Sequence, residues 1–157
     1  MKNVKVLWII IILLLALSGF LVKKFIIGGS NVIASTDGRS AVIMTKDERD
    51  LILAEMRDFL ISIQGVSQAI TEKDMDKVAS LAHKAGMAAE DGTPPALLQK
   101  IPLAMKKLGF DTRGKFDEIS ESAKTSKDPV LARKQLDALM LNCIACHAIY
   151  RLPEPQK

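Results

Sequence analysis

The sequence is poor in the residues on which zinc proteins and most enzymes depend. Its 157 residues include two cysteines and two histidines. A structural zinc site needs four ligands, and no second pair of closely spaced cysteines is present to complete one. We find no acid–base cluster, no glycine-rich phosphate loop and no nucleophile with a histidine partner, so the sequence does not indicate an enzyme.

An excess of charge is also lacking outside the N-terminal segment. The net charge of +4 equals the contribution of Lys2, Lys5, Lys23 and Lys24, because the 22 basic residues less these four match the 18 acidic residues. A neutral domain without a basic patch interleaved with aromatic residues gives no support for nucleic-acid binding. Strand-like alternation and internal repeats are missing as well, which favours an all-α fold.

One long apolar run is present near the N-terminus. Residues Val6 to Val22 carry no charge and would reach about 26 Å as a helix, close to the thickness of a hydrocarbon core. Ser18 to Phe20 make a poor signal-cleavage site, and the better one at Val32 to Ala34 lies far from the run. We therefore expect residues 1–27 to form an uncleaved membrane anchor, the alternative being a signal segment.

The remaining chain divides into a tether and a helical domain. Residues 28–44 are rich in glycine and serine and are expected to form a flexible tether. Thr45 and Glu48 form a capping-box pattern, and Asp128 before Pro129 is an N-cap pattern. Apolar periodicity then predicts helices over 46–70, 75–90, 112–125 and 129–152. Short loops favour antiparallel neighbours, so residues 45–157 are predicted to form an antiparallel four-helix bundle, all-α, with a separate transmembrane helix.

The last helix carries the sequence Cys143-Ile144-Ala145-Cys146-His147. The pattern C-x-x-C-H attaches haem c: the thiols form thioethers and the imidazole binds the iron. With two cysteines in the chain, a chance occurrence is on the order of one in a thousand. We predict one covalently attached haem c, held by both cysteines with His147 as the proximal ligand.

Other interpretations of this motif are a zinc site, a thioredoxin-like dithiol, and two buried helix cysteines beside a surface histidine. A thioredoxin-like dithiol follows a strand within a βαβ pattern, which this sequence lacks. Cys143 and His147 lie one turn apart on the apolar face of their helix. The haem would therefore lie against that helix and fill the domain interior.

A helical domain with C-x-x-C-H near the end of its fourth helix, followed by Tyr150 and Arg151, resembles the class II cytochromes c, the cytochrome c-prime family. The resemblance covers residues 45–152 and implies an up-down-up-down bundle with a histidine proximal ligand. In low-spin members, a methionine from the first helix binds the iron and the protein transfers electrons. Five-coordinate members present an apolar residue there and bind gases such as nitric oxide. The family often forms dimers, so a homodimer is also implied.

Met56 in the first predicted helix is the candidate for the sixth iron ligand. A thioether is a soft ligand that favours ferrous iron, whereas the alternative role of Met56 is filling the core. Weaker candidates are Met44, Met75, Met87, Met105 and Met140, with His83 for a second histidine ligand. Arg49 and Arg151 are candidates for contacts with the haem propionates, the alternative being solvent-facing side chains.

These features predict a membrane-anchored c-type cytochrome that carries electrons to redox partner proteins of a membrane electron-transfer chain. Because haem c is attached on the oxidising side of a membrane, we expect a single-pass protein of a bacterial inner membrane with its haem domain in the periplasm. If the N-terminal segment is cleaved, the protein would be periplasmic. The alternatives are a gas-binding haem protein with an open or displaceable sixth site, and an assembly module with a structural haem.

Overall fold

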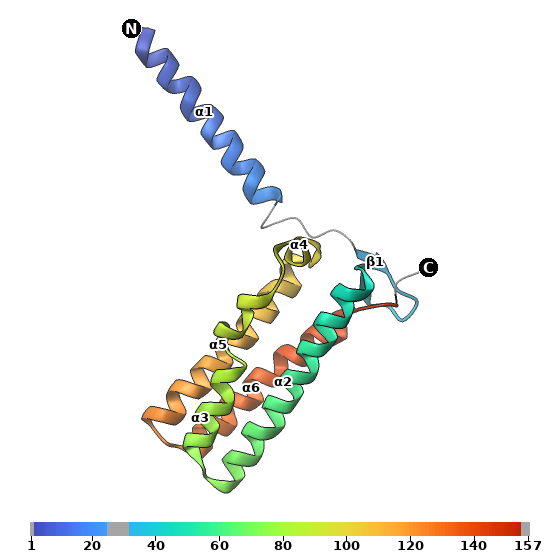
Figure 1. The fold of residues 1–157 in the computed structure, drawn as a ribbon, viewed down its shortest axis with the longest axis vertical. Helices are drawn as coiled ribbons and strands as arrows, with labels where there is room; N and C mark the ends of the chain where they lie inside the picture. Colours follow the sequence, from blue (N-terminus) through green and yellow to red (C-terminus); the bar gives the residue numbers. More distant parts are fainter. Residues whose placement is uncertain (1, 25–31, 155–157) are drawn as a thin grey trace.

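The computed structural model describes residues 2–24 and 32–154 of the chain. Figure 1 shows an N-terminal helix α1 (Lys2–Val22), followed by a helical domain that carries a small sheet. The strands are β1 (Val32–Ala34), β2 (Ser40–Val42) and β3 (Tyr150–Arg151). The helices are α2 (Lys46–Glu72), α3 (Met75–Lys84), the 3₁₀ helix η2 (Met87–Gly92), α4 (Pro95–Lys100), α5 (Leu103–Thr125) and α6 (Pro129–Ile149). The prediction of an all-α chain is confirmed.

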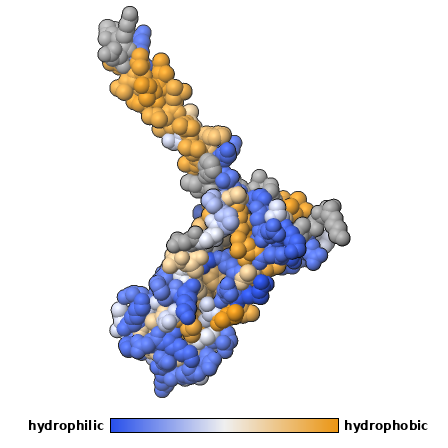
Figure 2. All heavy atoms as spheres, in the orientation of Figure 1, coloured by the Kyte–Doolittle hydropathy of each residue, from blue (hydrophilic) through white to orange (hydrophobic). Residues whose placement is uncertain are grey.

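The helix α1 is apolar along nearly its whole length. Its span Val4–Val22 is long and apolar enough to cross a membrane, and none of it is buried inside the protein. Figure 2 shows an apolar surface on α1, whereas the far end of the helical domain is mainly hydrophilic in the same view. The helix is therefore long and apolar enough to cross a membrane, two properties that an N-terminal signal sequence shares.

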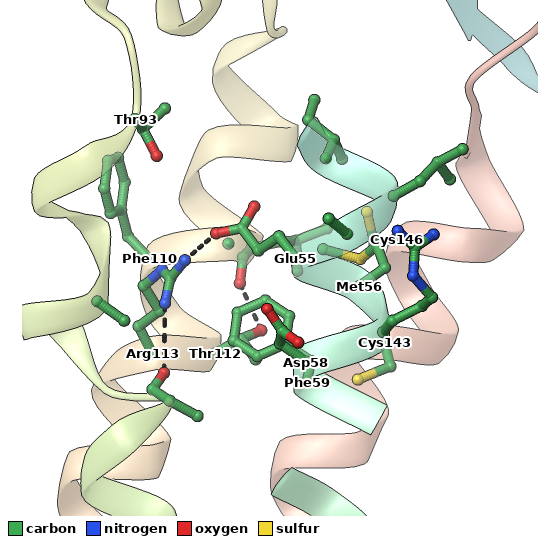
Figure 3. A pocket seen from close by; sticks show the side chains of 18 of the residues that line it. Glu55, Met56, Asp58, Phe59, Thr93, Phe110, Thr112, Arg113, Cys143 and Cys146 are labelled. Atoms are coloured by element: carbon green, nitrogen blue, oxygen red, sulfur yellow. Dashed lines mark hydrogen bonds and ion pairs between the residues drawn. The ribbon is translucent and has the colours of Figure 1, made fainter. Parts of the chain in front are cut away.

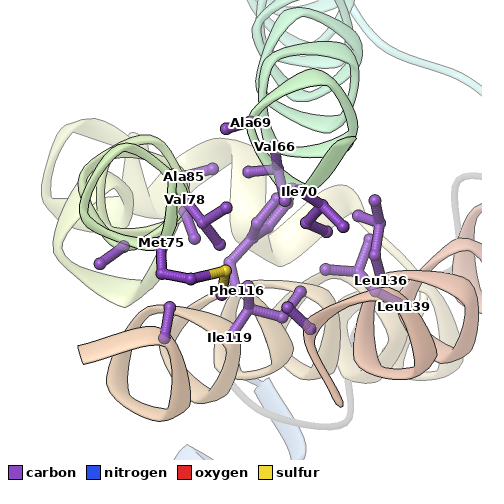
Figure 4. Packing of buried hydrophobic residues seen from close by; sticks show 14 residues of the cluster. Val66, Ala69, Ile70, Met75, Val78, Ala85, Phe116, Ile119, Leu136 and Leu139 are labelled. Carbon is purple, nitrogen blue, oxygen red and sulfur yellow. The ribbon is translucent and has the colours of Figure 1, made fainter. Parts of the chain in front are cut away.

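One apolar core joins the four long helices of the domain (Figure 4). Its buried side chains include Val66 and Ile70 from α2, Val78 and Ala82 from α3, Phe116 and Ile119 from α5, and Leu136 and Leu139 from α6. Only two residues separate α2 from α3, and three separate α5 from α6, so the chain reverses direction after α2 and after α5. We call the buried side chains of this cluster the lower core.

Local hydrogen bonds explain where α2 and α6 begin. The Thr45 hydroxyl accepts from the Glu48 amide, and the Glu48 carboxylate accepts from the Thr45 amide, which is the predicted capping box. At the start of α6, the Asp128 carboxylate accepts from the Val130 amide at 2.8 Å, and Pro129 occupies the first helical turn. Both predicted helix starts are confirmed.

The middle of the domain differs from the predicted helices. The helix α5 begins at Leu103, not 112, and runs without a break through Gly109 and Gly114. Each interior glycine costs about 1 kcal/mol of helix stability, which the burial of Phe116 and Ile119 against neighbouring helices offsets. The second predicted helix ends at Lys84 and is followed by η2 and the unpredicted α4.

The predicted flexible tether over residues 28–44 is wrong for its described part, which begins at Val32. Strands β1 and β2 form an antiparallel hairpin, and β2 pairs in parallel with β3, where Ser40 lies opposite Tyr150. Ala41 and Val42 are 3% and 0% exposed. The partner strand lies more than 100 residues away in the chain, so local composition did not reveal it. The domain thus begins at Val32, and β3 ends the fourth predicted helix at Ile149.

Gly86 lies where the chain turns from α3 toward η2, and it is packed against α5. The Asp117 carboxylate accepts from the Met87 amide at 2.9 Å, and a Cβ on Gly86 would lie 2.6 Å from Asp117 Cγ. We expect Gly86→Ala to lower the free energy of unfolding by about 1–3 kcal/mol, measured by urea denaturation. Gly114→Ala, where a Cβ meets nothing within 4 Å, should raise it by about 1 kcal/mol. Equal effects of the two variants would contradict this.

Candidate cofactor site

A cavity of about 790 Å³ lies between α2 and α5 and reaches the motif on α6 (Figure 3). Its volume falls within the roughly 300–1,000 Å³ of small-molecule and cofactor sites. The lining is largely apolar and includes Ile52, Phe59, Ile63, Leu97, Ile101, Leu108 and Phe110. We call it the motif cavity, because the four residues that α6 contributes are Asn142, Cys143, Cys146 and His147.

Two separate apolar clusters support the walls of the motif cavity. Phe59, Ile63 and Cys143 pack against the lower core. Met56 and Met105 pack against a second cluster that consists of Val42, Met44, Ile52, Leu97 and Ile101. The hollow is partly open to solvent, since its lining includes exposed side chains such as Leu60 and Phe110. An apolar hollow of this size between two packed clusters therefore indicates a site for a bound molecule.

Both thiols of the motif are free, half-buried and part of the cavity lining. Burial raises the pKa of Cys143, and burial together with the charge of Cys143 raises the pKa of Cys146. The thiols are therefore protonated at neutral pH, unlike the reactive thiol of a thioredoxin-like dithiol, whose pKa is lowered at a helix N-terminus. The motif lies in the last third of α6, far from that helix's N-terminus.

Met56, the predicted sixth ligand, lies on α2 in the cavity wall, and Figure 3 shows it on the same side as Cys143 and Cys146. Met105, one of the weaker candidates for the sixth ligand, also lines the cavity. The reason is that α5 begins at Leu103, so its first turn faces the cavity. His83 is exposed and lies outside the described lining, as do Met44, Met75, Met87 and Met140.

Arg49 and Arg151 are not among the described residues that line the cavity. Arg49 Nε donates to the Leu152 carbonyl at 3.3 Å, and Arg151 Nη1 donates to Ser35 Oγ at 3.0 Å. Both arginines thus hold the C-terminal strand against other parts of the domain. Their positions give no support to the predicted contacts with haem propionates.

Arg113 is a charged wall residue that the sequence did not reveal. It is 4% exposed, forms an ion pair with Glu55, and lies 4.9 Å from the centre of the Phe59 ring. Burial lowers its pKa. Arg113 lies three positions before Phe116, within the apolar stripe of its helix. That position in the sequence was the one sign that the side chain is buried. Figure 3 shows the Arg113 guanidinium and the Glu55 carboxylate joined directly in the cavity wall.

The Arg113–Glu55 pair provides a test of how the wall is stabilised. Glu55→Gln removes the carboxylate from a buried guanidinium, so we expect a loss of about 1–3 kcal/mol in the free energy of unfolding. Urea denaturation measures it, with Glu118→Gln on the exposed side of α5 as the matched control. Replacing both partners by apolar residues, Glu55→Leu with Arg113→Met, should recover part of the loss. A Glu55→Gln midpoint equal to that of the control would contradict this.

The residues of the motif cavity fit the group that C-x-x-C-H implies. The two half-buried thiols, the exposed imidazole of His147 and the thioether of Met56 line one largely apolar hollow of cofactor size. Arg57 and Lys84 also line the cavity and would supply cations for the two propionate carboxylates of a haem. Arg113 is already paired with Glu55. Within residues 2–24 and 32–154, no group of three or more histidine, cysteine, aspartate or glutamate side chains is arranged to hold a bare metal ion.

Comparison with known proteins finds no relative of this chain. No family model, no curated protein and no solved structure matches the chain.

Proposed function

We propose that this chain is a membrane-anchored c-type cytochrome that carries electrons through one covalently attached haem c. The observation that carries the proposal is that Cys143, Cys146 and His147 of the C-x-x-C-H motif all line an apolar cavity of about 790 Å³. The cavity is large enough for a cofactor, and the motif is the one that attaches this cofactor.

Each group of the chain has a defined task in this proposal. When bound, the haem supplies a one-electron redox centre. Cys143 and Cys146 hold it through thioethers, and His147 is the proximal iron ligand. Met56 on the facing helix is the distal ligand, a soft neutral thioether that favours the ferrous state. The apolar lining keeps water from the haem. Basic side chains of the cavity lining pair with the two haem propionates.

The proposal also includes the arrangement of the chain in the cell. The four long helices form an antiparallel bundle, and α1 anchors it to a bacterial inner membrane. Because haem c is attached on the oxidising side, the haem domain faces the periplasm. Its partners are redox proteins of a membrane electron-transfer chain, and the anchor keeps the domain near them. Outer-sphere transfer needs only proximity and matched potentials, so no catalytic residue is assigned.

A second candidate function is gas binding at an open or displaceable sixth site. It is favoured by the packing of Met56 against the cluster of Val42, Met44, Ile52, Leu97 and Ile101, where a methionine fills a gap in an apolar core. If Met56 is only a packing residue, the distal side of the iron is apolar and free for nitric oxide or carbon monoxide.

The optical spectrum of the full-length chain, purified in detergent after expression with haem-attachment machinery in an oxidising compartment, separates these functions. We expect low-spin spectra in both oxidation states, a methionine-to-iron charge-transfer band, and no response to carbon monoxide or nitric oxide. A high-spin spectrum that shifts with gas would favour the second function. A product without covalent haem would overturn both. The full-length chain is used so that β1, which begins at Val32, is kept.

A further inference from the structure

The hairpin of β1 and β2 meets the end of the helix that carries the haem motif. Arg39, which immediately precedes β2, donates from Nη1 to the His147 carbonyl at 3.3 Å. Strand β2 pairs with β3, whose first residue directly follows α6. Arg151 of β3 donates to Ser35 Oγ in the hairpin turn. Residues 35–41 thus contact the last turn of α6 through Arg39 and the strand that follows it through Ser35, Ser40 and Ala41.

Arg39 contacts the C-terminal end of α6, where backbone carbonyls lack hydrogen-bond partners within the helix. The last four carbonyls of an α-helix have no partner within the helix, and its C-terminus attracts cations. In α6, the Cys146 carbonyl accepts from the Tyr150 amide, and the next carbonyl, that of His147, accepts from Arg39. The backbone carbonyl of the motif histidine therefore takes this hydrogen bond from Arg39 and not from an amide of its own helix.

The guanidinium of Arg39 is held in place by its neighbours. Asp37 Oδ2 accepts from Arg39 Nε at 2.9 Å and from Nη2 at 2.7 Å, which leaves Nη1 directed at His147. The Ser35 amide donates to the Arg39 carbonyl at 2.9 Å, and Gly38 between them has a φ of 82°, which glycine adopts readily. Arg39 lowers the pKa of Asp37 to about 2, so the carboxylate is charged at neutral pH.

We propose that Arg39 is a positioning residue of the cofactor site: it fixes the last turn of α6 and so sets the direction of the His147 imidazole. This inference rests on the proposed function. The thioethers at Cys143 and Cys146 fix the motif on the N-terminal side of His147, and the hairpin fixes it on the C-terminal side. Only seven residues, 25–31, separate the hairpin from Lys24 after the membrane helix. The segment next to the anchor is therefore part of the iron site.

The test compares Arg39→Gln with Arg133→Gln in the full-length chain. Arg133, which lies on α6, likewise contacts another element, since it donates to Ser67 Oγ of α2 at 3.2 Å, but it lies nearly three turns before the motif. The first readout is hydrogen exchange of the amides of residues 148–151, which needs no bound haem. The second is the reduction potential of the haem-loaded protein.

We expect Arg39→Gln to speed exchange of these amides about tenfold or more and to shift the reduction potential, with Arg133→Gln matching the wild type in both. Arg39→Lys keeps the charge and should recover part of both effects. Wild-type values for Arg39→Gln, or equal changes in the two glutamine variants, would overturn the inference. If the chain carries no covalent haem, the proposed function fails, while the exchange rates still show whether Arg39 holds the end of α6.

Discussion

Replacing Cys143 and Cys146 together with serine is expected to abolish covalent haem attachment. Serine has no thiol to add to the haem vinyl groups, and these are the only two cysteines in the chain. The product should show no haem staining after denaturing electrophoresis and no Soret absorbance after extraction with acidified solvent. Retention of haem through that extraction would contradict the assignment of the motif.

The same double variant should also be much less stable than the haem-loaded protein. The motif cavity would be left wet and lined by apolar side chains such as Phe59 and Leu97, which removes the burial that a bound cofactor supplies. We expect circular dichroism to show a lower helix content and a lower midpoint of thermal unfolding. The loss should be greatest at the cavity end, because the lower core around Phe116 and Leu136 does not depend on the cavity.

A matched control changes the two middle positions of the motif. Ile144 is exposed, and Ile144→Ser with Ala145→Ser adds two hydroxyl groups to the same helical turn while it keeps both thiols and the imidazole. This control should retain covalent haem and stay close to the wild-type midpoint. A haem-free cysteine variant as stable as the control would count against the proposal that haem fills the domain.

Replacing Met56 is expected to convert a six-coordinate haem into a five-coordinate one. Met56→Leu keeps an apolar side chain of similar volume, so it removes the thioether with little change in packing. The charge-transfer band should disappear, and carbon monoxide should bind. The reduction potential should fall by on the order of 100 mV or more, since axial ligands set haem potentials over roughly 0.8 V. Absorption spectra and a redox titration measure these changes.

Met105→Leu is the matched control for Met56, because both methionines line the cavity and pack against the same apolar cluster. It should leave the spectrum and the potential unchanged. An unchanged spectrum in Met56→Leu, together with loss of the charge-transfer band in Met105→Leu, would move the sixth ligand to Met105. A wild-type spectrum that is already high-spin would instead favour gas binding.

Features that depend on neighbouring residues were predicted well. Thr45 with Glu48, and Asp128 with Pro129, mark the starts of α2 and α6, because a capping hydrogen bond spans only two or three residues. The apolar period of three to four residues located the faces of α2, α3 and α6 that are now seen in the lower core. The predicted third helix begins nine residues too late, at 112, because local propensity disfavours a helix through Gly109, and only tertiary packing outweighs that propensity.

Features that depend on distant residues were missed. The hairpin at Val32–Val42 gains its partner strand only when Tyr150 and Arg151 fold back against it. Arg49 contacts Leu152 and Arg151 contacts Ser35, so both lie outside the described cavity lining. Arg113, which pairs with Glu55, lies within it. Each of these pairings joins positions more than 50 residues apart, so no local pattern encodes them.

The sequence by itself determined where α2 and α6 begin, the apolar N-terminal span and the identity of the motif residues Cys143, Cys146 and His147. These follow from local hydrogen bonds, from side-chain periodicity and from the identity of reactive atoms. Only the tertiary structure decided that α2 and α5 leave a cavity beside the motif, that Met105 shares its wall with Met56, and that Arg39 reaches His147. The physical reason is that cavities and cross-chain contacts are set by how whole elements pack, which depends on side chains far apart in the chain.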